Sequence, residues 1–209
     1  KVHKNNETLG VLSPIHLNGD GTQLDANFSM FLKRYQVNEE ILYDSFSNKM
    51  KPFYQINFVN AAAWLIPLKT LQEVGGFDPL FFHYGEDDNY CQRVLFHNYS
   101  IGIVTKAVIM HDRGNRKASV IKPNSKKYFE EYERYAKMYW ADINLPDFEE
   151  KIHHKISYLN KQAFKNLIQF NFKNYKDLTQ KKKILLKLKP QLIKSRNNNT
   201  VKNSTYLNL

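Results

Sequence analysis

The sequence predicts an α/β domain followed by a basic helical extension, and two observations support this fold class. Up to about residue 120, short apolar runs typical of strands alternate with segments of helical periodicity. Beyond that point, apolar residues recur at three- and four-residue steps in a chain rich in lysine. The 209 residues are 42% hydrophobic, which is enough for one core with an appendage and too much for a disordered chain.

The charge distribution indicates where the chain divides. Residues 1–150 carry 17 basic and 19 acidic side chains, whereas residues 151–209 carry 14 basic side chains and one acid. We therefore expect a near-neutral domain over residues 1–120, a cationic amphipathic helical extension over residues 121–195, and a disordered tail over residues 196–209. Such an asymmetry usually reports an anionic partner for the basic part, either lipid or nucleic acid.

Cysteine usage and hydropathy exclude several classes of protein. The single cysteine, Cys91, excludes an internal disulfide framework and a four-cysteine zinc site, and it fits a reducing compartment. No run of about eighteen apolar residues could cross a bilayer as a helix. We expect a cytoplasmic protein, either free or peripheral on the inner face of the cell membrane. Because the chain begins at Lys1 without an initiator methionine or a signal peptide, we also expect it to come from the middle of a larger protein.

Four short strands are expected in the first domain, and residues 22–57 show no pattern that places an element. The expected strands cover residues 9–14, 58–66, 101–104 and 107–110. The run at 58–66 is nearly continuously apolar with small residues at its centre, which is typical of a strand buried on both faces where a ligand or another segment comes close.

Two helices are expected between these strands. Pro67 stands where the first would begin, and Gly75–Gly76 would end it, the order typical of a short helix. The second covers residues 86–98, where acids crowd the first turn and the positive end of the helix dipole favours them.

The extension is expected to be helical over three segments, residues 127–140, 151–172 and 181–192, with a break at Pro190. The first segment carries a stripe of four tyrosines, which favours packing between helices over a platform for sugars. They are Tyr128, Tyr132, Tyr135 and Tyr139.

Two features could perform chemistry, and each has a purely structural alternative. Glu86, Asp87 and Asp88 could hold a divalent cation or present a general base, but they could equally form the solvated acidic first turn of a helix. His111 ends an apolar strand, where sites are commonly built, yet a histidine there is more often structural than a ligand.

Four stretches together resemble a known family, and they cover roughly residues 55–115. They are Val59–Pro67, Val74–Phe82, Glu86–Arg93 and finally His111, which stands 24 residues after Asp87. Their order and spacing resemble those in the C-terminal half of inverting glycosyltransferases with the GT-A fold. Among these enzymes, the stretches are most similar to the family 2 branch that includes bacterial rhamnosyl- and galactofuranosyl-transferases. The resemblance implies the acceptor-side part of a GT-A mixed-sheet, Rossmann-like fold.

The resemblance also implies an activity, the transfer of a sugar with inversion from a nucleotide-sugar donor to a saccharide or lipid-linked acceptor. It implies that Asp87 is the catalytic base, that Glu86 and Asp88 orient the acceptor, and that Asn60 and Ala61 lie under the donor sugar.

The same resemblance implies that His111 is a ligand of Mn²⁺ or Mg²⁺ and that Arg93 is structural, paired with a nearby carboxylate. Most metal ligands would come from the family's nucleotide-binding half, which we expect to lie upstream of Lys1. Asp20 and Asp25 stand isolated in the sequence and do not replace it, so we expect no tight binding of a nucleotide-sugar by this chain alone.

One departure from the family pattern concerns the acidic run. Its last acid is Asn89 here, which removes a charge.

Several partners remain open for the basic extension. Residues 151–193 could bind an anionic membrane surface, or they could be solvated helices packed on the first domain, and a homo-oligomer is also possible. We expect no nucleic-acid partner, because the first domain has no basic patch and no reader motif. A non-catalytic scaffold, or a membrane- or nucleic-acid-binding module that uses the basic tail, is the alternative function.

Overall fold

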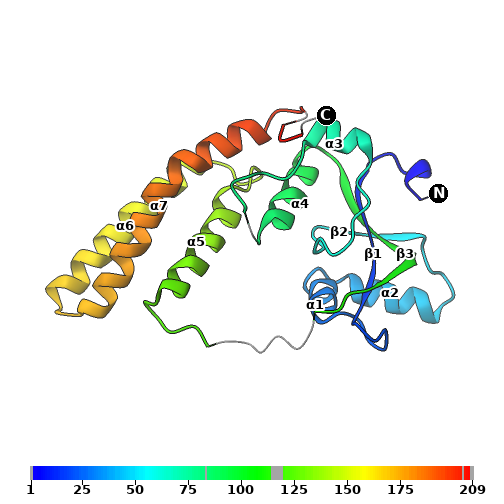
Figure 1. The fold of residues 1–209 in the computed structure, drawn as a ribbon, viewed down its shortest axis with the longest axis horizontal. Coiled ribbons are helices and arrows are strands. Elements are labelled where there is room, and N and C mark those ends of the chain that lie inside the picture. The colour runs from blue at the N-terminus through cyan, green and yellow to red at the C-terminus, as the bar shows by residue number, and fades with distance from the viewer. Residues whose placement is uncertain (1, 83, 114–119, 204, 208–209) are drawn as a thin grey trace. The chain divides into compact units, whose positions relative to one another are not determined.

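The structure, a computed structural model, describes residues 2–82, 84–113, 120–203 and 205–207 (Figure 1). The chain forms two compact units, and each consists of segments that are separated in the sequence by segments of the other. The first comprises Lys1–Phe77, Asp87–Lys117 and Thr200–Leu209, and the second comprises Asp78–Glu86 and Ala118–Asn199. The expected boundary near residue 120 is therefore close to an observed one. Residues 78–86, which were expected in the first domain, belong to the second unit, and residues 200–209 belong to the first unit.

A three-stranded mixed sheet organises the first unit, as the α/β prediction requires. Its strands are β1 (Leu9–Leu17), β2 (Phe53–Ile56) and β3 (Ser100–Met110), in the order β1-β3-β2. The central strand β3 pairs in parallel with β1 and antiparallel with β2. Because β1 and β3 run in the same direction, their carboxyl ends meet at one edge of the sheet.

The strands differ from the prediction in three ways. β1 continues through Pro14, where the register with β3 shifts, so the missing proline N–H falls at an irregularity of the ladder. β3 is one strand of 11 residues rather than two short ones.

The expected buried strand over residues 58–66 is wrong. The chain turns at Asn60, whose carbonyl accepts a 2.9 Å hydrogen bond from the Ala62 N–H, and only Leu65 forms a bridge, to Leu12. An apolar run without alternation does not distinguish a strand from a buried turn.

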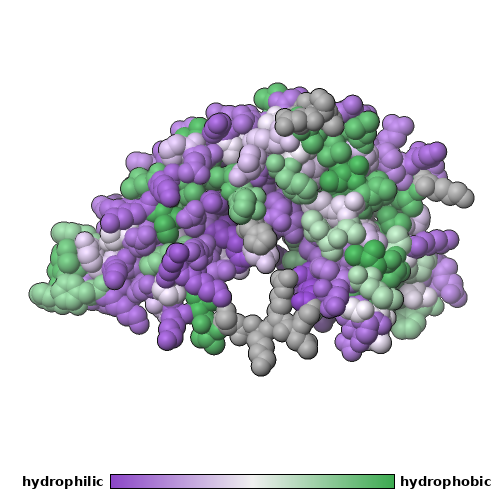
Figure 2. Space-filling view, in the orientation of Figure 1, coloured by the Kyte–Doolittle hydropathy of each residue, from purple (hydrophilic) through white to green (hydrophobic). Residues whose placement is uncertain are grey.

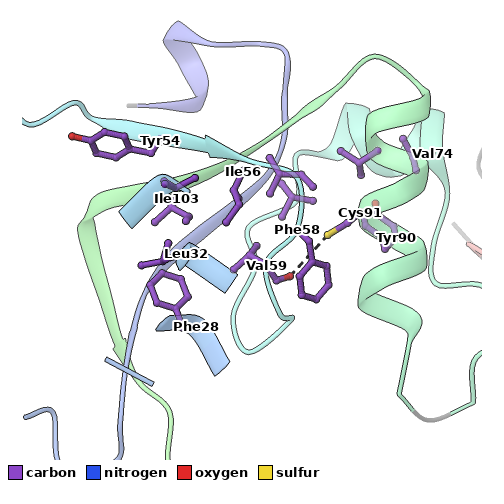
Figure 3. Packing of buried hydrophobic residues seen from close by; sticks show 14 residues of the cluster. Phe28, Leu32, Tyr54, Ile56, Phe58, Val59, Val74, Tyr90, Cys91 and Ile103 are labelled. Atoms are coloured by element: carbon purple, nitrogen blue, oxygen red, sulfur yellow. Dashed lines mark hydrogen bonds between the residues drawn. The ribbon is translucent and has the colours of Figure 1, made fainter. Parts of the chain in front are cut away.

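Helices from both halves of the first unit pack on the sheet. The 3₁₀ turn His3–Asn5 contributes no buried residue, whereas the packed helices are α1 (Ala26–Arg34), α2 (Val37–Phe46), α3 (Leu68–Val74) and α4 (Glu86–Phe96). Their apolar faces share one core with the strands (Figure 3). In that core the Cys91 thiol donates a weak 3.9 Å hydrogen bond to the Val59 carbonyl, and burial raises the pKa of the thiol.

The double glycine after α3 ends the helix as predicted and receives the C-terminal segment. Gly75 has a φ of 85°, and a Cβ there would collide with the Thr205 carbonyl oxygen. The Gly76 N–H donates a 2.8 Å hydrogen bond to that same oxygen. Of the tail expected to be disordered over residues 196–209, residues 196–199 instead form the last turn of a helix, and Thr205 contacts the double glycine.

Arg93 is buried in α4 and is structural, as the resemblance implied. Its guanidinium donates to the carbonyl oxygens of Gly76 and Val74 and lies over the Tyr206 ring. Its partners thus include backbone carbonyl oxygens and the rings of Tyr90 and Tyr206, and the expected pairing with a carboxylate stays a prediction.

Three helices form the second unit: α5 (Lys126–Trp140), α6 (Phe148–Ile168) and α7 (Phe172–Asn199). The apolar faces of α6 and α7 are buried against each other and α5, around residues such as Ile152, Leu159, Leu185 and Leu188. α7 continues through Pro190, so the predicted break is wrong. Among the helices described, none combines the length and hydropathy needed to cross a membrane.

Candidate functional site

The carboxyl ends of β1 and β3 bring two histidines together. His16 is the penultimate residue of β1, and His111 follows directly after β3, where its N–H donates a 2.8 Å hydrogen bond to the Leu17 carbonyl. The two imidazole rings are 6.1 Å apart and nearly perpendicular. The prediction that His111 projects from a strand end is confirmed, whereas His16 was not identified from the sequence.

Asp25 completes this cluster, although no pattern in the sequence places it here. Its Oδ1 accepts a 2.9 Å hydrogen bond from the Phe28 N–H and so caps α1. Its Oδ2 lies 2.6 Å from Nε of Arg113 and 3.7 Å from Nδ1 of His111. Asp25 stands isolated in the sequence, but the parallel pairing of β1 with β3 brings it beside His111 in space.

At neutral pH the cluster combines an uncharged histidine, His16, with a carboxyl group, Asp25, whose pKa is lowered. Burial and the nearby charges of His111 and Arg113 lower the pKa of His16 from 6.5 to about 4, although Asp25 and Asn60 oppose the shift. His16 is therefore neutral at pH 7, and its Nε2 is 3.0 Å from the Ser13 hydroxyl. Burial opposes ionisation of Asp25, but the Phe28 amide and Arg113 outweigh it and lower the pKa of that carboxyl.

Asp87 lies at the start of α4 and faces the turn that carries the small residues. Its Oδ2 accepts a long hydrogen bond, 3.4 Å, from the Ala61 N–H, and its Oδ1 accepts one of 2.9 Å from the Asp88 N–H. The neighbouring Asn60 is buried and interacts with His16. Asp87 and the histidine cluster therefore flank the same turn of the first unit, the turn at Asn60 and Ala61.

The other members of the acidic run have different surroundings. Glu86 opens α4 but belongs to the second compact unit, and its Oε2 is buried without a hydrogen bond to the described residues. Asp88 is half-buried on the first turn, where the helix dipole favours its charge. Asn89, which replaces an acid of the family pattern, is 1% exposed, so a charge at this position would be buried.

The described residues do not by themselves make a metal site. They contain no group of three or more His, Cys, Asp or Glu side chains placed to hold a cation. His111 offers one buried nitrogen, Nδ1, that makes no hydrogen bond with the described part of the chain. The nearest carboxylate, Asp25, already accepts hydrogen bonds from Arg113 and Phe28.

Two grooves on the described residues lie away from Asp87 and His111. One, of about 680 Å³, runs along β1 and β3 past Leu12, Trp64 and Val108, and its lining does not include Asp87 or His111. The other, of about 720 Å³, lies between α5 and α6 in the second unit. It is lined by part of the predicted tyrosine stripe, Tyr132, Tyr135 and Tyr139, so two members of that stripe are exposed rather than packed.

Comparison with known proteins yields no relative for this chain: no family model, no curated protein and no solved structure matches it.

Proposed function

We propose that this chain contributes the acceptor side of an inverting glycosyltransferase of the GT-A fold. The reaction would transfer a sugar from a nucleotide-sugar to a hydroxyl of a saccharide or lipid-linked acceptor, with Asp87 as general base. The proposal rests on the resemblance of the four sequence stretches, and the geometry around Asp87 supports it.

The chemistry requires one well-placed carboxylate. The acceptor oxygen forms a bond to the anomeric carbon while the bond to the nucleoside diphosphate breaks on the opposite face, and the acceptor proton passes to the base. A carboxylate that is already ionised can take that proton, and such general-base help contributes roughly 10²–10⁴-fold to the rate. Asp87 lies in the first turn of α4, where the positive end of a helix dipole favours a negative charge.

The observation that carries the proposal is the approach of Asp87 to the turn at Asn60. The Ala61 N–H holds the Asp87 carboxylate at 3.4 Å, and Ala61 itself is exposed, so its methyl group leaves room beside the base. In the proposed site Asn60 and Ala61 lie under the donor sugar, while Glu86 and Asp88 orient the acceptor.

His111 keeps a narrower role in the proposal, as one imidazole ligand of Mn²⁺ or Mg²⁺. Because the described residues lack a complete ligand set, the other ligands would have to come from outside them. A cation bound there would neutralise charge on the leaving diphosphate.

The test replaces Asp87 with asparagine in the full product of the gene. Release of nucleoside diphosphate from uridine- and thymidine-diphosphate sugars is followed with and without saccharide acceptors. We expect Asp87→Asn to lower kcat by about 10²-fold or more, because the amide cannot take the acceptor proton. The unfolding midpoint should change little, since the side-chain shape is kept.

The matched control is Glu39→Gln, which removes an exposed carboxylate from α2 and should leave turnover unchanged. Turnover by Asp87→Asn equal to that of the parent protein contradicts the base assignment. Absence of turnover in both proteins over the whole donor panel favours the scaffold alternative.

A further inference from the structure

The turn between α6 and α7 exposes a cluster of large apolar side chains. We call it the hairpin tip, and it consists of Phe164, Leu167, Ile168, Phe170 and Phe172. Phe170 is 79% exposed and Phe164 is 63% exposed. Figure 2 shows apolar side chains gathered over the end where these two helices meet in Figure 1. Scattered apolar residues are common on surfaces, but a contiguous cluster at a protruding turn marks an interaction site.

The cluster forms a single surface. Phe164, Leu167 and Ile168 are separated by three and four positions, so they lie on one face at the end of α6. Across the turn, the rings of Phe170 and Phe172 are 6.2 Å apart at 70°. The tip is therefore a rigid apolar wedge built by two helix ends.

The backbone of the turn is defined by a helix-ending motif that normally uses glycine. The Phe170 N–H donates to the Leu167 carbonyl at 3.1 Å, and the Asn171 N–H donates to the Asn166 carbonyl at 2.9 Å. Phe170 occupies the left-handed position with φ of 55°, which is costly for a bulky side chain. A phenylalanine that is both strained and exposed lowers the stability of the hairpin and fills no part of its core, which is compatible with a role in binding.

Positively charged side chains flank the tip. Four exposed lysines flank it on the two helices, namely Lys161, Lys165, Lys173 and Lys176. No acidic residue occurs between Glu150 and Asp177. The surface around the apolar wedge is thus complementary to an anionic one.

We propose that the hairpin tip inserts into the interface of an anionic phospholipid bilayer, with its phenyl rings at the acyl boundary and the four lysines on the headgroups. Binding of this kind gains from buried apolar area and from each lysine near the surface. The site is the tip and not the amphipathic faces of residues 151–193, because those faces are buried in the core of the hairpin.

Two other occupants fit the tip less well. A second copy of the chain would bring two sets of flanking lysines together, and like charges oppose such a contact. A nucleic acid would use aromatic rings for stacking, whereas Leu167 and Ile168 offer no such surface. The proposal does not depend on the proposed glycosyl transfer, so either can fail alone.

The experiment is flotation of the full chain with extruded vesicles of two compositions. One is pure phosphatidylcholine, and the other contains about 30 mol% phosphatidylglycerol, since anionic lipid attracts basic segments. We expect binding to the anionic vesicles only, with a loss of binding in about 0.5 M salt, where charges are screened. The double variant Phe170→Ser/Phe172→Ser should bind at least about tenfold more weakly, because two apolar side chains no longer enter the interface.

Two further variants separate the tip from general effects. Phe46→Ser removes a phenylalanine of α2 that is 81% exposed, and it should leave binding unchanged. Phe170→Gly relieves the left-handed strain, so it should unfold at the same or a higher temperature and still bind more weakly. A parallel pair, Lys165→Glu/Lys173→Glu, should weaken binding on the order of tenfold or more.

Three results overturn the proposal. The first is equal flotation of the parent chain and the serine double variant, which would assign binding to the basic surface as a whole. The second is absence of flotation with anionic vesicles. The third is self-association in analytical ultracentrifugation that the serine variant abolishes without any lipid binding by the parent chain, since the tip would then be an interface between copies.

Discussion

At the scale of single residues, two tyrosines of the first unit are expected to make the unit less stable as the pH becomes alkaline. Burial raises the pKa of Tyr90, and burial together with the hydrogen bond to Glu73 raises the pKa of Tyr99 to about 12. A pKa raised in the folded state means that the folded protein holds the phenol proton more tightly than the unfolded chain does. This stabilisation is complete below the unfolded pKa of about 10 and is lost as the pH rises toward 12.

We therefore expect the urea midpoint of unfolding to fall between about pH 9 and about pH 11, more steeply in the parent protein than in Tyr90→Phe/Tyr99→Phe. Phenylalanine has no phenol proton, so the double variant should lose part of the pH dependence. The measurement is urea unfolding followed by far-ultraviolet circular dichroism at each pH. Identical slopes for the two proteins would show that neither tyrosine contributes.

The residues that the structure adds to the candidate site show what a residue-level pattern can and cannot predict. His111 could be placed at a strand end because an apolar run precedes it. His16 and Asp25 could not, because their relevance depends on which strand pairs with which. Asp25 did carry one local signal, its position before the helix that it caps, but that signal explains only its structural role.

At the scale of elements, the sequence predicts helices with clear end signals better than it predicts strands. α3 lies between Pro67 and Gly75 as expected, since each residue acts through its own backbone restrictions. The run at residues 58–66 had no such signal. Its first residues, Phe58 and Val59, enter the core, the chain then turns, and Trp64 and Ile66 pack against the same core. Hydrophobicity indicates burial, but the partner of a buried segment lies far along the chain.

α7 was expected to break at Pro190 and does not, which has a measurable consequence. Pro190 lacks the N–H that would bond the Leu186 carbonyl, and its ring crowds the preceding turn. Burial of Leu185, Leu188 and Leu192 on both sides holds the helix together. Because Pro190 is exposed and makes no core contact, Pro190→Ala should raise the free energy of unfolding by about 2 kcal/mol.

Thermal unfolding followed by circular dichroism measures this gain, as a rise of several degrees in the midpoint. The control is Lys183→Ala, an exposed position of the same helix with no lost hydrogen bond to restore. A midpoint for Pro190→Ala below that of the parent protein would mean that the proline supports the path of α7 rather than straining it.

At the scale of the whole molecule, the path of the chain explains why composition alone did not predict the contacts of the C-terminal segment. The polar, asparagine-rich C-terminus was expected to be disordered, yet the chain returns there to the first unit. Its partners are backbone groups of Glu73 and Gly76, which no composition rule identifies. The charge asymmetry, in contrast, depends on composition alone, and most lysines of α6 and α7 are exposed in the structure.

This return of the chain predicts that removal of residues 200–209 destabilises the first unit. The deletion removes the Thr205 carbonyl from the Gly76 N–H, the Asn203 N–H from the Glu73 carbonyl, and the Tyr206 ring from the buried Arg93. Two lost backbone hydrogen bonds and a newly uncovered guanidinium should together lower the free energy of unfolding by about 2–3 kcal/mol. Urea unfolding of the deletion variant and the parent chain measures the difference. In the matched control, Glu73→Gln, the surface ion pair with Lys202 is lost while the amide oxygen can still accept the hydrogen bond from Tyr99, so the change should cost less than about 1 kcal/mol. A deletion that costs no more than this control would show that the segment adds nothing beyond its surface charge.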